Sequence, residues 1–152
     1  MPRFHKGVGL KKLYVASDHA GYDLKESLFQ SAIAAQHGFE FVDLGPGNSE
    51  RVDYPDFSTK VVNAVLKDQS SLGLLICGSG QGMAMSANRN KGIRAALAWN
   101  EESAKLSREH NNANVLCLGS RMIDTQLAGN ILISFLRSVF EGGRHSARLE
   151  KF

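Results

Sequence analysis

Short apolar segments of strand length alternate along the chain with longer segments of helical period. In the longer segments, apolar side chains recur every three or four positions, which is typical of a helix with one buried face. A glycine or proline marks several boundaries, as Gly38 does after the first helical segment and Pro55 at the start of the next. The predicted strands are residues 13–16, 39–44, 72–76, 93–98 and 115–118, and the predicted helices are residues 22–36, 55–66, 83–90, 101–109 and 124–140.

Five strands, each followed by a helix, indicate an α/β fold in which helices cover both faces of a parallel sheet. We predict a three-layer α/β/α sandwich with a Rossmann-like, doubly wound five-stranded parallel sheet of order 2-1-3-4-5. Residues 1–152 are expected to form one domain, with a flexible N-terminal extension over residues 1–10 and a C-terminal tail over residues 141–152. Such sheets bind ligands just beyond the carboxyl ends of their strands, so functional side chains are expected there.

Composition narrows the class of protein. Of the 152 residues, 43% are hydrophobic and 22% charged, as in an ordinary globular protein. A net charge of +3 without a basic run argues against a nucleic-acid-binding protein. No apolar stretch approaches the ~18 residues of a membrane span. Cys77 and Cys117 occur without a CxxC motif, which indicates free thiols and a cytoplasmic protein. The five histidines lack metal-ligand spacing, so neither a metal nor another cofactor is expected.

The most informative segment is CGSGQG, residues 77–82, at the end of the third strand. Its alternating glycines, Gly78, Gly80 and Gly82, permit a backbone that turns successive N–H groups inward to hold an anion. The spacing fits neither the dinucleotide-binding GxGxxG motif nor a P-loop. The loop therefore indicates an anion without showing which one. Ser79 either presents its hydroxyl to a ligand or simply forms the turn.

Two interpretations of Cys77 are open, because it directly precedes the glycine loop. Buried cysteines are usually structural, and this interpretation suits Cys117 inside the fifth strand. A thiol beside inward-pointing amides and a helix N-terminus has a lowered pKa. Such a thiol takes a proton from a substrate while the amides hold the resulting oxyanion. Cys77 is therefore a candidate general base.

Other strand ends carry titratable and amide side chains. Asp18 and His19 follow the first strand, where Asp18 either caps the next helix or meets a ligand. His110, before the fifth strand, either supplies a cation at a helix end or acts on a substrate. Asn111 beside it suits a sugar hydroxyl. Arg121 follows the fifth strand, on the ligand side.

The tail contains Arg144 and Arg148, four residues apart. In a helix both guanidinium groups lie on one face, where two planar forks suit one phosphate. A solvated basic terminus has the same spacing. Together with the candidate base and the glycine loop, these residues indicate a small phosphorylated carbonyl compound and proton transfer next to its carbonyl group.

Six short motifs occur in one order between residues 13 and 148. They are SDHAG (17–21), DYP (53–55), CGSGQG (77–82), REHN (108–111), GSR (119–121) and GGRHSAR (142–148). In this combination the chain resembles the type B ribose-5-phosphate isomerases, a family that also contains the galactose-6-phosphate isomerase subunits. The resemblance implies a metal-independent interconversion of D-ribose 5-phosphate and D-ribulose 5-phosphate through a cis-enediolate, in the non-oxidative pentose phosphate pathway.

The resemblance also implies a role for each motif. Cys77 moves a proton between C1 and C2, the amides of residues 78–82 stabilise the enediolate, and the Ser79 hydroxyl assists at the carbonyl. His110 opens the furanose ring, with Asn111 beside it. The remaining implied substrate contacts are Asp18, Tyr54 and Gln81, and His19, Arg121, Arg144 and Arg148 around the phosphate.

The same resemblance bears on assembly and on the base. Relatives form homodimers whose sites take residues from both subunits, and some pair into tetramers, so the tail arginines are expected to come from a partner.

Ser79 stands where threonine is common, and the hydroxyl is kept. Some relatives lack the cysteine and use a glutamate at the position of Met83. Because methionine is not a base, the pattern favours Cys77.

Two other functions fit parts of the pattern. An isomerase of a hexose 6-phosphate, such as allose or galactose 6-phosphate, uses the same chemistry and differs in pocket shape, which the sequence does not show. A non-catalytic flavodoxin-like module that binds FMN or another phosphate ligand accounts for the glycine loop. It leaves Cys77, His110 and the tail arginines unexplained.

Overall fold

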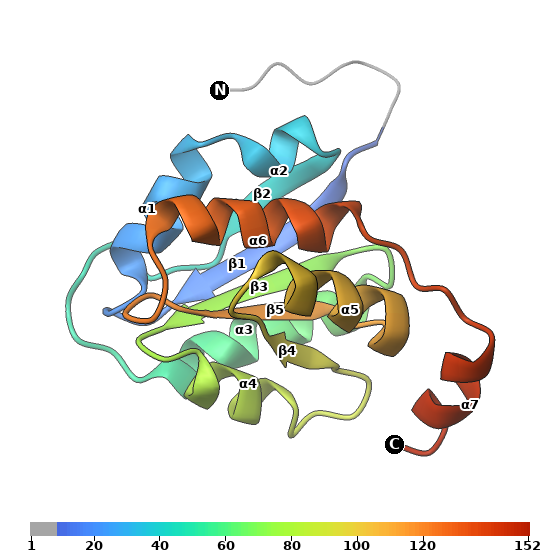
Figure 1. Cartoon of the computed structure of the whole chain (residues 1–152). Helices are drawn as coiled ribbons and strands as arrows, with labels where there is room; N and C mark the ends of the chain where they lie inside the picture. The colour runs from blue at the N-terminus through green and yellow to red at the C-terminus, as the bar shows by residue number, and fades with distance from the viewer. Residues whose placement is uncertain (1–8) are drawn as a thin grey trace.

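Five parallel strands form one sheet at the centre of the protein (Figure 1). The computed structural model describes residues 9–152, so the extension expected over residues 1–10 lies almost wholly outside the described residues. Every predicted strand is present, close to its expected bounds. The strands are β1 (Lys11–Ser17), β2 (Phe39–Asp43), β3 (Leu72–Cys77), β4 (Ala95–Leu97) and β5 (Val115–Gly119).

The predicted strand order is wrong at one edge. The order is β2-β1-β3-β5-β4 rather than 2-1-3-4-5, because β5 pairs with β3 on one side and with β4 on the other. All five residues of β5 are buried, which suits an interior strand. The three residues of β4 are only half-buried, which suits a short edge strand. The chain therefore crosses from β3 to the edge of the sheet and returns to its interior.

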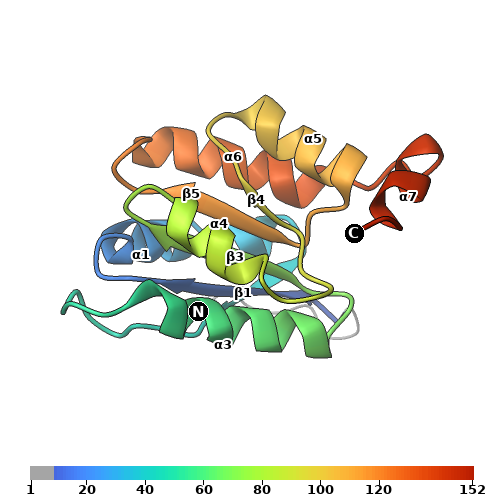
Figure 2. The same ribbon diagram turned by 90° about the horizontal axis from the view of Figure 1, so that it is seen from below.

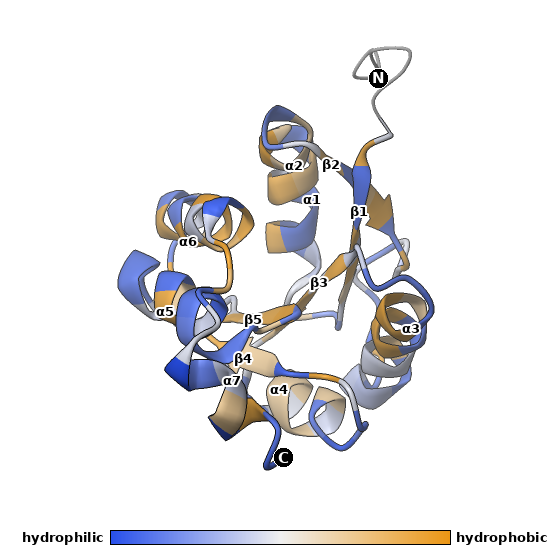
Figure 3. Cartoon of the chain, turned by 90° about the vertical axis from the view of Figure 1, so that its right-hand side faces the viewer, coloured by the Kyte–Doolittle hydropathy of each residue, from blue (hydrophilic) through white to orange (hydrophobic). Residues whose placement is uncertain are grey.

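Helices cover both faces of the sheet, which confirms the three-layer sandwich (Figure 3). On one face lie α3 and α4, whose Val61 and Met83 join an apolar cluster with that side of the strands. On the other face lie α1, α5 and α6, whose Leu28, Ala104 and Phe135 join the second cluster. The helices are α1 (Tyr22–Gln30), α2 (Ile33–Gln36), α3 (Tyr54–Lys67), α4 (Gln81–Ala87), α5 (Glu101–Asn111), α6 (Thr125–Arg137) and α7 (Arg144–Leu149).

The helix predicted over residues 22–36 is broken in two. Ala32, between α1 and α2, has φ +59°, in the left-handed region. Ser31 Oγ donates to the Leu28 carbonyl at 2.6 Å, and such local side-chain bonds offer the backbone an alternative to a continuous helix. The tail forms α7, so Arg144 and Arg148 share one helix. Among the described residues, no helix is long and apolar enough to cross a bilayer.

Candidate active site

Three loops meet at the carboxyl edge of the sheet, on the left in Figure 1. The loop after β1 contacts β3, where Asp18 N donates to Ile76 O at 3.1 Å. The loop after β5 contacts both of the others: Ser120 N donates to Cys77 O at 2.9 Å, and Ser120 Oγ donates to Ala20 O at 2.8 Å. These bonds bring segments that are far apart in the sequence to one place.

The glycine loop after β3 is closely packed against the ends of β4 and β5. Gly80 has φ +77°, which favours glycine. A Cβ on this residue would lie 2.5 Å from Leu97 Cδ1 and 2.9 Å from the Leu118 carbonyl carbon. Gln81 N donates to Ser79 Oγ at 3.3 Å. The Ser79 hydroxyl therefore helps to form the turn, while the serine itself stays exposed.

Cys77 ends β3 beneath this loop. It is only 4% exposed, and its Sγ accepts a hydrogen bond from Gly80 N at 3.2 Å. The main-chain N–H of the glycine loop thus points at the sulfur. Cys117 is fully buried in β5, where burial, with a smaller contribution from Cys77, raises the pKa of its thiol far above the ordinary value. The structure thus separates an amide-bonded sulfur at the sheet edge from a sulfur sealed in the core.

Asp18 and His19 occupy the same edge. Asp18 is 7% exposed, and its Oδ1 accepts from Gly21 N at 3.0 Å, which closes the turn that precedes α1. The Asp18 carboxylate therefore bonds to Gly21, the N-cap residue of α1, and the helix has no side-chain cap hydrogen bond, so Asp18 does not cap it. His19 Nδ1 lies 3.2 Å from Val52 O and 3.3 Å from Val52 N, so the loop before α3 orients the ring.

A buried lysine, which the sequence analysis did not single out, anchors that loop. Lys25 is fully buried and donates to both carboxylate oxygens of Asp43, at 2.8 and 2.7 Å, and to Pro46 O at 2.9 Å. The ion pair and the carbonyl bond offset the loss of hydration of a buried ammonium group. The anchored chain then continues to Val52, which contacts His19. A charged residue on a predicted helix usually lies in solvent, so the sequence offered no signal for this role.

Tyr54 and Arg121 flank the glycine loop. Tyr54 begins α3, and a Cβ on Gly82 would lie 2.6 Å from its ring Cζ. The Arg121 guanidinium reaches Gly78, where a Cβ would lie 3.0 Å from Nη1. The two glycines therefore leave room for a phenol and a guanidinium group. The carboxyl-edge half of the site, as we name it, consists of Asp18, His19, Tyr54, residues 77–82 and Arg121.

The other predicted site residues lie at the opposite edge of the sheet. His110 and Asn111 end α5, which runs back from the carboxyl edge, and Arg144 and Arg148 lie on α7 beyond it (right in Figures 1 and 2). These four residues form the amino-edge half. Within one chain the structure does not bring the amino-edge half to Cys77, so the crevice expected from the sequence is divided in two.

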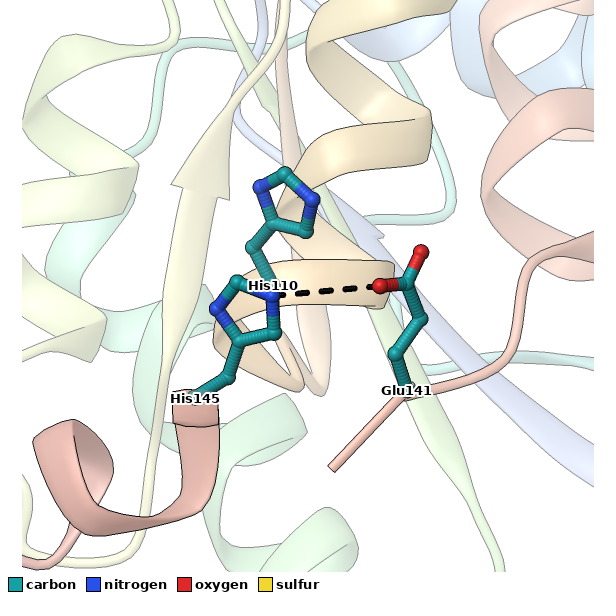
Figure 4. A group of neighbouring side chains, drawn as sticks. All are labelled: His110, Glu141 and His145. Atoms are coloured by element: carbon teal, nitrogen blue, oxygen red, sulfur yellow. Dashed lines mark ion pairs between the residues drawn. The ribbon is translucent and has the colours of Figure 1, made fainter. Parts of the chain in front are cut away.

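Two further residues join the amino-edge half (Figure 4). His145 stacks on His110 with ring centroids 4.3 Å apart and an interplanar angle of 17°. Glu141 Oε2 lies 3.8 Å from His145 Nε2. Burial, and then the positive charge of Arg144, lowers the pKa of His145. Neither residue could be assigned a role from the sequence, because a double glycine lies between them and hides their spacing of four.

The same three side chains are of types that bind metal ions. His110, Glu141 and His145 offer ligand-type atoms that all lie within 4.8 Å of one another. Ligand atoms around a tetrahedral zinc ion lie only ~3.4 Å apart, given bonds of about 2.0–2.1 Å. Arg144 and Arg148 place positive charge beside these atoms. A dication would be repelled by these two guanidinium groups.

Comparisons with known proteins give consistent matches. The family described as ribose/galactose isomerase matches residues 13–152. Ribose-5-phosphate isomerase B of Escherichia coli K12 is 40% identical over 141 residues, 93% of each chain. The structure of ribose 5-phosphate isomerase B from Anaplasma phagocytophilum has a TM-score of 0.86 at 48% identity, over 93% of this chain and 96% of that one. The Mycoplasma genitalium structure with bound ribulose-5-phosphate has a TM-score of 0.87 at 44% identity, over 92% of each.

Proposed function

The chain belongs to the ribose/galactose isomerase family, and on this premise we propose that it is an aldose–ketose isomerase that interconverts D-ribose 5-phosphate and D-ribulose 5-phosphate. The observation that carries the proposal is the 3.2 Å hydrogen bond from Gly80 N to Cys77 Sγ at the carboxyl edge of the sheet. It puts a candidate base and main-chain donors together where parallel sheets bind ligands. The ribulose 5-phosphate bound to the Mycoplasma genitalium relative supports the choice of sugar.

In the proposed reaction Cys77 is the base. Its thiolate takes the proton from C2 of the open-chain aldose, and the C–H electron pair forms the C1–C2 double bond as the C1 carbonyl oxygen becomes an enediolate oxygen. The amides of residues 78–82 hydrogen-bond this oxygen. Cys77 then returns the proton to C1, while the C2 hydroxyl proton passes to the C1 oxygen with help from the Ser79 hydroxyl. The product is the ketose, and the thiolate is restored.

The amino-edge half supplies the earlier step. His110 takes the proton of the C1 hydroxyl as the bond from C1 to the ring oxygen breaks, and its imidazolium then gives that proton to the ring oxygen, while Asn111 binds the sugar. The two halves share the substrate contacts. Asp18, Tyr54 and Gln81 are assigned to the sugar, and His19, Arg121, Arg144 and Arg148 to the phosphate.

This assignment requires a homodimer, because the two halves lie at opposite edges of one chain. The amino-edge half of each chain, with residues 141–152 packed on the partner, would complete the carboxyl-edge half of the other, which gives two shared sites. Exposed apolar side chains near the carboxyl edge support such a contact. Trp99, after β4, is 65% exposed, and Met122, after β5, is 71% exposed. Sedimentation of the purified protein distinguishes a dimer from a tetramer.

The first test removes the proposed base. Turnover of ribose 5-phosphate by Cys77→Ala should fall by about 10²–10⁴-fold, the usual effect of losing a general base. Cys117→Ala is the matched control, because it removes the other thiol without touching the glycine loop, and it should keep its activity. No turnover by the unmodified protein would reject the function. Equal turnover by Cys77→Ala would reject only the base.

The sugar is tested separately, because the family description names galactose as well as ribose. Allose 6-phosphate and galactose 6-phosphate are compared with ribose 5-phosphate by kcat/KM. We expect the pentose phosphate to be preferred, and a preference for either hexose phosphate would move the function to that substrate.

A further inference from the structure

The loop between β2 and α3, residues 44–53, lies beside α1 at the carboxyl edge of the sheet (left in Figure 1). Two side chains of α1 hold its first half. Lys25 Nζ donates to Pro46 O at 2.9 Å, and Tyr22 OH donates to Gly47 O at 3.3 Å. The bond from Lys25 is buried and charge-assisted, whereas the bond from Tyr22 is exposed to solvent. Lys25 is therefore the stronger anchor of this loop.

The second half of the same loop meets His19. Glu50 N donates to Asn48 Oδ1 at 3.0 Å, which closes a turn that leads the chain to Val52. His19 Nδ1 lies 3.2 Å from Val52 O and 3.3 Å from Val52 N. His19 comes three residues before α1. Residues 19–25 therefore hold the loop at both ends, and the loop in turn orients the His19 ring.

Stability alone does not explain why a lysine lies here. Lys25 is fully buried, and its Nζ lies 2.7 Å from Asp43 Oδ2. Asp43 Oδ1 also accepts from Gly45 N at 2.8 Å, so the same carboxylate bonds both the lysine and the start of the loop. An ion pair with a buried charge is often no more stabilising than apolar side chains of similar size. An apolar side chain, however, could not donate a hydrogen bond to Pro46 O.

The orientation of the His19 ring matters because the proposed function assigns this residue to the phosphate. An imidazole in a loop turns about two side-chain torsions, and the second of these is broadly populated. A contact of Nδ1 with the main chain of Val52 restricts that rotation and sets the role of the other ring nitrogen. If the loop shifts, the ring loses this contact, and a shift of about 1 Å is enough to weaken a substrate contact.

We propose that Lys25 is a positioning residue, which acts through residues 44–53 and holds the His19 imidazole in place for the phosphate group of the substrate. The inference rests on the proposed function and adds a residue to it. Lys25 is fully buried, so it contacts neither the substrate nor the reacting atoms.

The experiment removes the ammonium group. Lys25→Met keeps a long apolar side chain and loses the bond to Pro46 O. We expect KM for ribose 5-phosphate, and the inhibition constant of inorganic phosphate as a competitor, to rise about tenfold, as for a weakened hydrogen bond to a charged group. The value of kcat should change less than about threefold, because the loop around Cys77 is untouched.

Two further variants separate the tether from the ion pair. Asp43→Asn removes the negative charge but leaves Lys25 able to bond both the amide oxygen and Pro46 O, so KM should stay within about threefold. Lys25→Met combined with Asp43→Asn leaves no unpaired charge beside the buried side chain. This double variant should fold if the single one does not, and it should show the same rise in KM.

A general loss of stability is distinguished by a control and by a spectroscopic measurement. Leu132→Ala removes a fully buried side chain of α6 and should lower the Tm without changing KM. The imidazole ¹⁵N chemical shifts of His19, measured without substrate, report its contact with Val52. They should change in the proteins that carry Lys25→Met and stay the same in Leu132→Ala.

Each outcome supports or overturns one claim. Unchanged KM and unchanged His19 shifts in both Lys25 variants, or an equal rise of KM in Leu132→Ala, would overturn the positioning role. His19→Ala should raise KM at least as much, and adding Lys25→Met to it should cause little further change. An unchanged KM in His19→Ala would reject the phosphate contact, and the proposal with it. If the unmodified protein does not convert ribose 5-phosphate, the proposed function fails, while the His19 shifts still test whether Lys25 holds the ring.

Discussion

Single residues of the same type have different chemistry here because their neighbours differ. Cys77 and Cys117 lie on the adjacent strands β3 and β5 and share one apolar cluster. Cys77 is the last residue of its strand, so its sulfur meets the amide of Gly80 in the loop that follows. Cys117 lies in mid-strand, and burial keeps its thiol protonated. A place at the end of a strand or in its middle thus distinguishes a candidate base from an inert thiol.

The buried Cys117 thiol should make the protein less stable at alkaline pH. Its pKa is raised in the folded state, so above about pH 8.5 the unfolded chain releases a proton that the folded chain keeps. Stability from this group is complete below that pH and is lost as the pH rises, by up to about 1.4 kcal/mol per pH unit. Urea unfolding at pH 7.5 and 9.5 measures the loss, which should be smaller in Cys117→Ala. Equal losses in the two proteins would contradict the assignment.

At the scale of elements, the glycine loop depends on strands that follow it in the chain. Gly80 lies against Leu97 of β4 and the backbone at Leu118 in β5, and β5 and β4 follow β3 in the order of the sheet. A loop with glycines could be flexible, but these contacts and the left-handed backbone of Gly80 define one conformation. The packing therefore determines where the N–H group of Gly80 points, and so whether it donates a hydrogen bond to Cys77 Sγ.

Gly80→Ala should damage both stability and activity. The left-handed backbone costs a residue with a Cβ about 1–2 kcal/mol, and the contact at 2.5 Å with Leu97 adds to this. Because the loop must shift, the amide leaves Cys77 and turnover should fall by at least about tenfold. Gly38→Ala is the control: Gly38 has φ +84° but nothing within 4 Å of an added Cβ.

Thermal unfolding and turnover of the two variants separate the effects. Gly38→Ala should lose stability through its backbone alone and keep full activity. Full activity in Gly80→Ala would show that the amide does not support the base.

At the scale of the whole molecule, the proposed dimer gives each chain half of each of two sites. The carboxyl-edge half ends in loops, whereas the amino-edge half is formed by the last turn of α5 and by α7. Both halves are held by contacts within the chain, including the stack of His145 on His110. In the proposed dimer, activity should therefore depend on how the two chains meet.

Mixing two inactive variants tests this arrangement. Cys77→Ala and His110→Ala should each be almost inactive alone. After unfolding and refolding together, half of the dimers should be mixed, and each mixed dimer should hold one intact site, which gives about a quarter of the original activity for a closed two-fold dimer. If both halves of each site came from one chain, the mixture would stay inactive.

The amino-acid sequence by itself determined the structural features that depend on residues close together in the chain. Apolar periodicity placed all five strands, and the alternating glycines of residues 77–82 identified the loop around Cys77, because period and backbone freedom act over a few residues. The helix break at Ala32 was not predicted, because the local hydrogen bond from Ser31 Oγ to Leu28 O is a weak signal compared with the helical periodicity around it.

Only the tertiary structure decided what depends on contacts between distant segments. It placed β5 between β3 and β4, and it buried Lys25 against Asp43. It also stacked His145 on His110 and put the two halves of the candidate site at opposite edges of the sheet. Periodicity shows which face of an element is buried but not against what. Strand order and side-chain partners follow from the packing of the whole chain, where small differences in burial select one arrangement.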